Sequence, residues 1–393
     1  MKLLFVQGGS RWKFDNCGNV YTDANFNEHI WDRYRSYCEE LTVMLKSEEM
    51  IYDHEVAKSK FNFFDSSKSR YVSLPDIYKP VTRFLNIKDR RIIQSTIERE
   101  VLRADAIIIR SIGTYYTNTT LKIAQKHNKP YSVEETGFSF EALWYHSLFG
   151  KMAAIPNEIS TKRLMKKVPS AIYVTNKALQ KRYPCKGKSI GCSDVEISIN
   201  DVNLEKKLNK QEHPKVVFGT AAFLDVGWKG QKYVIRAIGE LKKAGINNIE
   251  YQLIGSGTGD SLKNEIAKYD VSDEVRIIGA LPHNEVFAWL DNLDVYIQTS
   301  FMEGLCRSII EAMSRACPVL CTDVGGNNEL VDKECLIKKG NVNDIKKHLV
   351  MMLDKKNRIK HCVQNFEKAK EYEKTVLDAK RDSFYHDFFS TVK

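Results

Sequence analysis

The stretch Thr299–Met313 reads TSFMEGLCRSIIEAM, and it directly follows a short apolar run that is typical of a buried strand. After Gly304, apolar residues recur at spacings of three and four, which indicates a helix. The first N–H groups of a helix have no partner within it, and we expect those of Leu305, Cys306 and Arg307 to be free. Free N–H groups at the positive end of the helix dipole form an anion site. The order of strand, turn and helix therefore predicts an α/β protein with a ligand site at this turn.

Two glutamates frame the turn. Glu303 precedes the glycine, so its carboxylate is expected at the mouth of the anion site. Glu311 follows eight positions later, which places it about two turns up the helix. A carboxylate there can accept hydrogen bonds from a vicinal diol such as ribose, as acidic residues do in other nucleotide sites. We therefore expect Glu303 near the reacting group and Glu311 on a ribose.

The length and composition of the chain favour a globular protein of two domains. It has 393 residues, of which 43% are hydrophobic and 28% charged. We find no apolar run of about 18 residues, so no membrane span is expected. The nine cysteines are an odd number, and the N-terminus lacks the pattern of a secretion signal. Reduced thiols and a cytoplasmic location are therefore the expectation.

The net charge is +10, and the pI is near 8.9. This charge is compatible with a solvated basic surface, and also with attraction to an anionic membrane or to a phosphorylated ligand. Nucleic acid is not expected as a partner, because no nucleic-acid motif accompanies the charge. One region is especially basic, and it is either a solvated face or a face turned towards a membrane. Its basic residues are Lys162, Arg163, Lys166, Lys167, Lys177, Lys181, Arg182, Lys186 and Lys188.

Short apolar runs alternate with longer amphipathic stretches along the chain, which predicts βαβ units and parallel sheets. Sheets of this kind bind ligands outside the carboxyl ends of their strands. We expect strands at Leu3–Val6, Leu41–Leu45, Ala106–Ile109, Tyr131–Val133, Ala171–Val174, Val216–Phe218, Tyr251–Ile254, Arg276–Ile278, Val295–Gln298 and Val319–Cys321.

The polar segment Asn200–His213 interrupts this alternation and is expected to be a linker. It divides the chain into a first domain, residues 1–198, and a second domain, residues 199–375. Residues 376–393 are expected to form a helix that packs back on the first domain.

The helix of the opening stretch runs on into a second strand and a glycine turn. The sequence continues as Ala312–Val319, AMSRACPV, and then as Gly325–Glu329, GGNNE. The order of glutamate, glycine, helix, Cys-Pro strand and Gly-Gly turn resembles the retaining glycosyltransferases of family 4, which have the glycosyltransferase B fold. Two glutamates at this spacing carry little information alone, whereas the ordered set is specific.

The resemblance implies an α/β protein of two Rossmann-like domains that face each other across a cleft. It also implies a nucleotide-sugar donor, transfer with retention of anomeric configuration, and no metal or other cofactor. No Asp-x-Asp lies at a strand end of the second half, in keeping with that expectation. Glu303 is the first catalytic residue that the resemblance implies. The donor contacts that it implies in this stretch are Gly304, Leu305, Cys306, Arg307 and Glu311.

A loop with the sequence VGWKGQ, Val226–Gln231, follows the first strand of the second domain. In similar enzymes, a Lys-Gly here places an ammonium on the donor diphosphate, which makes Lys229 the second expected catalytic residue. Many relatives also have an arginine directly after the glycine of that strand. Here the position is Thr220, which is counted with the donor contacts, and Arg307 is the candidate for the missing cation. A solvated lysine is the alternative for Lys229.

Two further strand ends are expected beside the nucleotide. Gly255 begins the run GSGTG after one strand, and Gly279 is followed by Leu281 after the next. The glycine run is not a dinucleotide fingerprint, because no acidic residue ends a strand about 20 positions later. The resemblance instead implies that Gly255, Gly279 and Leu281 line the nucleotide pocket, and plain turns are the alternative.

The first domain is expected to bind the acceptor. Gly8 and Gly9 follow the first strand and fit a glycine loop that lets two substrates approach, or a tight turn only. The ranges 21–34 and 131–144 resemble bacterial capsule and exopolysaccharide transferases, and the second includes Glu134 and Glu135 on the acceptor side. Many family members have a histidine near those glutamates, and this chain does not.

These features predict a glycosyltransferase that moves a sugar from a nucleotide sugar to a saccharide acceptor in the synthesis of a capsule, exopolysaccharide or lipopolysaccharide. The expected acceptor is linked to a lipid diphosphate, and the expected location is the cytoplasm, either in solution or on the inner face of the cell membrane. The alternatives are transfer to a soluble acceptor and a nucleotide-sugar-binding protein without activity. A nicotinamide-dependent oxidoreductase is a more distant alternative.

Overall fold

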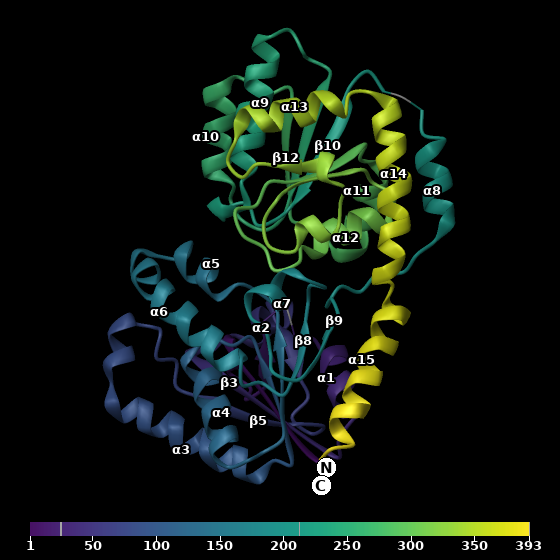
Figure 1. Cartoon of the computed structure of the whole chain (residues 1–393). Helices are drawn as coiled ribbons and strands as arrows, with labels where there is room; N and C mark the ends of the chain where they lie inside the picture. The colour runs from purple at the N-terminus through teal and green to yellow at the C-terminus, as the bar shows by residue number, and fades with distance from the viewer. Residues whose placement is uncertain (24–25, 212, 393) are drawn as a thin grey trace. The chain divides into compact units, whose positions relative to one another are not determined.

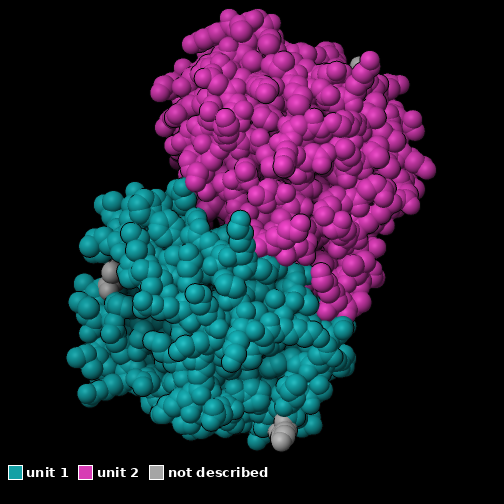
Figure 2. All heavy atoms as spheres, in the orientation of Figure 1, with its two compact units in different colours: residues 1–173, 180–191, 381–393 teal, residues 174–179, 192–380 magenta. Residues whose placement is uncertain are grey.

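The computed structural model describes residues 1–23, 26–211 and 213–392, so Ala24, Asn25, Glu212 and Lys393 of the segments discussed above lie outside it. The chain forms two compact units, which Figure 1 and Figure 2 show. Unit 1 comprises residues 1–173, 180–191 and 381–393, and unit 2 comprises residues 174–179 and 192–380. All ten predicted strands are present. None of the helices in the described ranges is long and apolar enough to cross a bilayer.

Unit 1 is built on a mixed sheet in which the central strands are parallel. Strand β1 lies between β3 and β6, and β7, β8 and β9 follow beyond β6. The short strands β2 and β4 add an antiparallel edge that the sequence did not predict. The strands are β1 (Lys2–Asp15), β2 (Val20–Thr22), β3 (Glu40–Tyr52), β4 (Asn62–Phe64), β5 (Arg70–Leu74), β6 (Ala106–Arg110), β7 (Tyr131–Glu135), β8 (Ser170–Tyr173) and β9 (Lys188–Gly191).

The helices of unit 1 cover this sheet, and the final helix of the chain returns to it (Figure 1). They are α1 (Glu28–Arg35), α2 (His54–Lys60), α3 (Ile87–Arg103), α4 (Tyr115–Lys126), α5 (Ser139–Trp144) and α6 (Leu148–Met165), with a 3-10 turn η1 (Val81–Leu85). The boundary between the units falls within α7 (Ala178–Arg182) and again within α15 (Lys374–Phe389).

Unit 2 contains a parallel sheet with the order β12-β11-β10-β13-β14-β15. Helices α9, α10 and α13 lie on one side of it, and α11, α12 and α14 lie on the other (Figure 1). The strands are β10 (Val216–Ala221), β11 (Ile249–Ile254), β12 (Val275–Gly279), β13 (Val295–Gln298), β14 (Val319–Thr322) and β15 (Leu336–Ile337). The helices are α8 (Asp201–Leu208), α9 (Gln231–Lys243), α10 (Asp260–Tyr269), α11 (His283–Asn292), α12 (Arg307–Ser314), α13 (Val342–Met351) and α14 (Lys355–Ala369), with 3-10 turns η2 (Gly227–Lys229), η3 (Asn327–Glu329), η4 (Lys333–Cys335) and η5 (Lys370–Tyr372).

The predicted linker Asn200–His213 is wrong in its first half, because that half is helix α8. The side chain of Asn200 caps the helix by accepting a hydrogen bond from the N–H of Val202. On its inner face, Leu204 and Leu208 pack against a small apolar cluster that includes Phe366 of α14. The segment is polar because only one face of the helix is buried.

Candidate functional site

The loops predicted to bind the donor meet at one edge of the unit 2 sheet. From β10 the chain moves to β11 and β12 on one side and then returns to β13 on the other side of β10. In open α/β sheets, ligands bind outside the carboxyl ends of the strands where the order reverses in this way. Lys229 lies in the loop after β10, and Glu303 lies in the loop after β13. The two predicted catalytic residues therefore flank the switch point.

Lys229 and Glu303 form an ion pair. The Nζ of Lys229 lies 2.7 Å from the Oε1 of Glu303, and the side chains are 21% and 13% exposed. Burial acts to lower the pKa of Lys229, but the charge and the hydrogen bond of Glu303 outweigh it, so the pKa is raised. Lys229 is therefore an ammonium at neutral pH, and it keeps a path to solvent.

Gly230 allows the two loops to meet. It has a φ of 79°, and a Cβ at this position would lie 2.0 Å from the carbonyl oxygen of Thr299. Next to this contact, the N–H of Phe301 donates to the carbonyl oxygen of Trp228 over 2.7 Å. Both residues of the Lys-Gly sequence therefore matter. Gly230 lets the two loops come close, and this contact places Lys229 beside Glu303.

The Gly-Gly turn after β14 supports Glu303 from the other side. Gly325 has a φ of 58°, and a Cβ there would lie 1.9 Å from the carbonyl oxygen of Glu303. The N–H of Gly326 donates to the carbonyl oxygen of Gly304 over 2.7 Å. The motif that suggested the family resemblance is therefore one packed unit in space.

Helix α12 begins later than the sequence predicted, since Cys306 is its N-cap and Arg307 its first residue. Leu305 precedes the helix, so the expectation that its N–H belongs to the first turn is wrong, and the N–H of Ser308 takes that place. Burial raises the pKa of the Cys306 thiol to about 12, with the charge of Glu303 adding to the shift. The thiol is therefore neutral at neutral pH, so no thiolate charge cancels the positive end of the helix dipole.

Glu311 lies on the second turn of α12 and is half-buried. Gly255 and Gly279 are brought together, because the N–H of Gly255 donates to the carbonyl oxygen of Gly279 over 2.8 Å. Leu281 follows and is half-buried. Gly255, Gly279 and Leu281 lie at or just after the carboxyl ends of β11 and β12, and the contacts of all four residues with a donor stay predictions.

Thr220 requires a correction. Its side chain is buried, and its hydroxyl donates to the carbonyl oxygen of Ile297 on the neighbouring strand and lies 2.8 Å from the hydroxyl of Tyr251. Both partners are inside unit 2, so the side chain is not available to a donor. The position that is arginine in many relatives is here part of the interior.

The sequence did not predict a buried polar network beneath the Glu303 loop. The hydroxyl of Tyr296 lies 2.8 Å from the Oγ of Ser308 at the start of α12. The Nε2 of Gln298 donates to the Oγ of Ser300 over 2.7 Å, and the Oγ1 of Thr322 donates to the carbonyl oxygen of Ser300 over 2.6 Å. The feature of the sequence that could have indicated this network is the presence of polar residues at the end of an apolar strand. Such bonds hold the loop in one conformation because breaking them would leave buried polar groups unpaired.

In unit 1, Gly8 and Gly9 do not form a loop, and that prediction is wrong. Strand β1 continues through them, with a shift of register against β3 between Val6 and Arg11. A Cβ on Gly8 would lie 2.0 Å from the Oγ1 of Thr114, the N-cap of α4. The glycines therefore mark an irregularity in the strand and a close approach to α4.

Glu134 and Glu135 end β7 and are both buried. Glu134 pairs with Arg110 and accepts hydrogen bonds from Tyr385 and, at 2.8 Å, from Tyr34. The Oε2 of Glu135 accepts from the N–H of Ile112, and burial raises the pKa of Glu135 to about 8. Both carboxyl groups are thus engaged by the interior of unit 1, and their contact with an acceptor stays a prediction.

Two Rossmann-like α/β units, with the predicted donor residues at the switch point of the second, define a glycosyltransferase of the B fold. The crystal structure of Anabaena HepE in complex with UDP and glucose supports the fold, with a TM-score of 0.63 and 13% identity over 98% of this chain and 100% of that chain. The sequence profile of the family described as "Glycosyl transferases group 1" matches residues 201–369.

Protein CapJ of Staphylococcus aureus is 30% identical over 392 residues, which cover 97% of this chain and 94% of CapJ. The amylovoran biosynthesis glycosyltransferase AmsK of Erwinia amylovora is 29% identical over 157 residues, 37% of this chain and 38% of AmsK. The chain therefore belongs to the group 1 glycosyl transferases, which are family 4 of the glycosyltransferases, and the predicted enzyme class is confirmed.

Proposed function

We propose that this enzyme moves a sugar from a nucleotide sugar to a lipid-diphosphate-linked saccharide, with retention, in the synthesis of a cell-surface polysaccharide. The location of the proposed active site is supported by the ion pair of Lys229 and Glu303 at the switch point of unit 2. The polysaccharide context rests on the match to AmsK, a glycosyltransferase of amylovoran biosynthesis.

The donor diphosphate lies against the N-terminus of α12 in this proposal, and its ribose lies against Glu311. Lys229 then turns from Glu303 to a phosphate oxygen, which leaves the Glu303 carboxylate to orient the sugar. An ammonium and free helical N–H groups stabilise the charge that develops on the departing phosphate. Arg307 is exposed at the first position of the helix and can add a second positive charge.

The reaction breaks the bond between the anomeric carbon and the phosphate oxygen, and it forms a bond from that carbon to the acceptor oxygen. The proton of the acceptor hydroxyl goes to the departing phosphate oxygen on the same face of the sugar. Neither a metal nor a protein base takes part in this scheme. In this proposal, residues 1–198 hold the acceptor, and residues 199–375 hold the donor.

A donor screen tests the proposal. UDP-, GDP- and ADP-sugars are added one by one, and the donor raises the melting temperature because it binds the folded chain only. The chosen donor is then incubated with a lipid-diphosphate saccharide, and the anomeric configuration of the product is read by NMR. A product of inverted configuration, or no melting shift with any nucleotide sugar, would overturn the proposal.

A further inference from the structure

Helix α6 of unit 1 carries a row of large apolar side chains that point away from the protein. Leu148, Phe149, Met152, Ile155 and Ile159 are between 45% and 79% exposed. They occupy the first three turns of the helix and share its outer side. We refer to these five residues as the outer face of α6. A contiguous exposed apolar surface of this kind marks an interaction site in a soluble protein.

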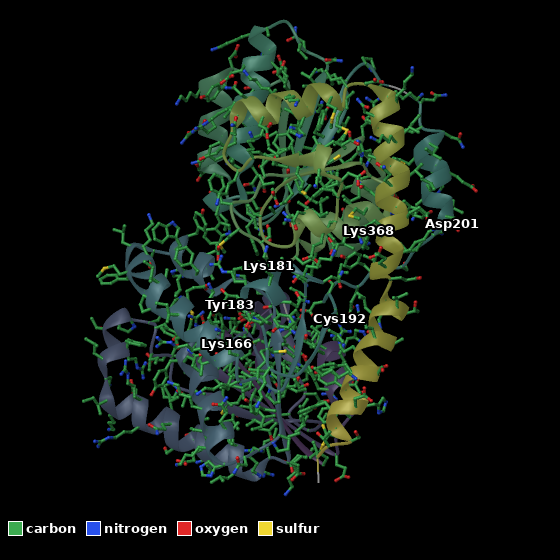
Figure 3. All side chains as sticks on the ribbon, in the orientation of Figure 1. Lys166, Lys181, Tyr183, Cys192, Asp201 and Lys368 are labelled. Carbon is green, nitrogen blue, oxygen red and sulfur yellow. The ribbon has the colours of Figure 1, made fainter. Side chains whose placement is uncertain are left out.

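The outer face is not needed to hold α6 in place. The opposite side of the helix already packs on unit 1, through Ala154, Thr161, Leu164 and Met165 among others. Glu158 also points inward, where it accepts hydrogen bonds from Tyr183 and Arg182. Tyr183, which bonds Glu158, and Lys166, the C-cap of α6, are both labelled in Figure 3. Helix α6 is therefore anchored on one side, while the described residues of unit 1 leave its outer face exposed.

The exposed charges on α6 itself have one sign. Glu158 is the only acidic residue in α6, and it is buried. Lys151 lies within the exposed turns, with its Nζ 5.6 Å from the centre of the Trp144 ring, and Trp144 itself is exposed. The helix then ends in exposed basic residues, Lys162, Arg163, Lys166 and Lys167. Apolar side chains beside lysines, with a tryptophan at the border, suit the interface of an anionic bilayer.

A second exposed apolar group in unit 1 has charges of both signs around it. Met50, Ile51 and Phe63, on β3 and β4, are between 51% and 62% exposed. Their exposed neighbours include Glu49, Glu55, Lys58 and Lys60. Charges of both signs give this group no net attraction to a negative lipid surface, so it matches the outer face of α6 in exposure but not in charge.

We propose that the outer face of α6 inserts into the headgroup region of an anionic phospholipid bilayer, with the following lysines on lipid phosphates. This inference rests on the proposed function only for its purpose, which is to bring the enzyme to a lipid-linked acceptor. The basic segment suggested a membrane from the sequence, and the outer face adds the apolar anchor. Either feature alone binds weakly, because stable attachment requires two signals.

Vesicle flotation tests the proposal with the full chain. Vesicles of phosphatidylcholine with phosphatidylglycerol should carry the wild type upward, and vesicles of phosphatidylcholine alone should carry much less. The triple variant Leu148→Ser, Phe149→Ser, Met152→Ser should lower the partition coefficient by about tenfold or more. The matched variant Met50→Ser, Ile51→Ser, Phe63→Ser should float like the wild type. Lys166→Ala with Lys167→Ala should weaken only the binding to anionic vesicles, and less so at high salt.

Trp144 gives a second measurement of the same contact. Brominated lipids should quench the tryptophan fluorescence of the wild type, and Trp144→Phe should remove most of that quenching. The proposal is overturned if the wild type does not float, or if both triple variants float equally. It is also overturned if sedimentation shows that the α6 variant only abolishes a dimer, since the outer face would then bind a second copy.

Release of nucleoside diphosphate from the donor separates this inference from the proposed function. The α6 variant should release it at the wild-type rate in the absence of vesicles, because the substituted residues belong to unit 1, whereas Lys229 and Glu303 belong to unit 2. A wild type that floats but releases no nucleoside diphosphate contradicts the proposed function and leaves the membrane contact standing. A wild type that turns over its donor but does not float contradicts the membrane contact alone.

Discussion

Both sheets place carboxyl groups at the carboxyl ends of parallel strands, but the two units hold them differently. In unit 2, Glu303 is paired with a lysine that keeps a path to solvent. In unit 1, Glu134 is held by Tyr34, Tyr385 and Arg110 in the interior. A lysine on a flexible stem can exchange one anion for another, whereas hydroxyl groups fixed by packing cannot. We therefore expect a ligand at Glu303, whose partner can exchange, rather than at Glu134.

The largest expected effect breaks the ion pair of unit 2. Lys229→Ala should lower kcat by about 10²- to 10³-fold, because a preorganised charge near the departing phosphate is lost. Steady-state release of nucleoside diphosphate measures it. Lys210→Ala is the control, since Lys210 pairs with Asp294 at the same 2.7 Å and the side chains are 20% and 16% exposed. That pair lies near the amino end of β13, so the control should keep its turnover, and equal losses would contradict the assignment.

The next largest expected effect concerns the close contact between the loop of Lys229 and the loop of Glu303. Gly230→Ala should lower the free energy of unfolding by about 1–3 kcal/mol, because the methyl group meets the Thr299 carbonyl in a left-handed conformation. Gly227→Ala, in the same loop, has no neighbour within 4 Å of the added Cβ and should be nearly neutral. Urea unfolding compares the two variants. Similar stabilities would show that the loop can move aside.

The pH dependence of the free energy of unfolding tests whether the buried carboxyl group of Glu135, in unit 1, holds a proton. The pKa of Glu135 is about 8, raised by burial from about 4.3 in an unfolded chain. Between these values the folded chain holds a proton that the unfolded chain has lost, so the free energy of unfolding falls as the pH rises. The slope is at most about 1.4 kcal/mol per pH unit, and it ends above pH 8 or so. Glu135→Gln should remove this contribution in urea unfolding across the range, and an unchanged profile would count against the buried proton.

The smallest expected effect removes one partner of Glu134. Tyr385→Phe deletes a buried hydroxyl that donates to the carboxylate, which should cost about 1–2 kcal/mol of the free energy of unfolding. Turnover should be retained, because Glu134 acts in the packing of unit 1. Tyr71→Phe, at a partly exposed ring, is the control and should be neutral. A large loss of turnover in Tyr385→Phe would instead place Glu134 at the acceptor.

The apolar runs were sufficient to predict the ten principal strands, because buried parallel strands are apolar on both faces. The donor motif was predicted as well, and the ion pair brings its two halves together. The edge strands β2 and β4 were missed, since they are three residues each and carry little pattern. Helix α8 was taken for a linker because only Leu204 and Leu208 show its buried face.

Other errors arose where the sequence does not reveal the direction of a side chain. Thr220 follows a strand glycine as an arginine does in relatives, yet its hydroxyl bonds into the interior. Gly8 and Gly9 suggested a turn, although glycine is also accommodated in a strand where another helix comes close. The outer face of α6 was likewise hidden, because apolar spacing indicates a helix without showing which of its sides is covered.

The return of α15 to unit 1 has a consequence for synthesis on the ribosome. Residues 192–380 of unit 2 emerge as an unbroken segment, whereas unit 1 remains incomplete until residues 381–393 arrive. At about 5–20 residues per second, this delay is roughly 10–40 s. During that time, the Glu134 carboxylate lacks the hydroxyl of Tyr385. The domain that begins first in translation is therefore the one that finishes folding last, and a nascent chain stalled before Tyr385 should expose unit 1 to proteases while unit 2 is already folded.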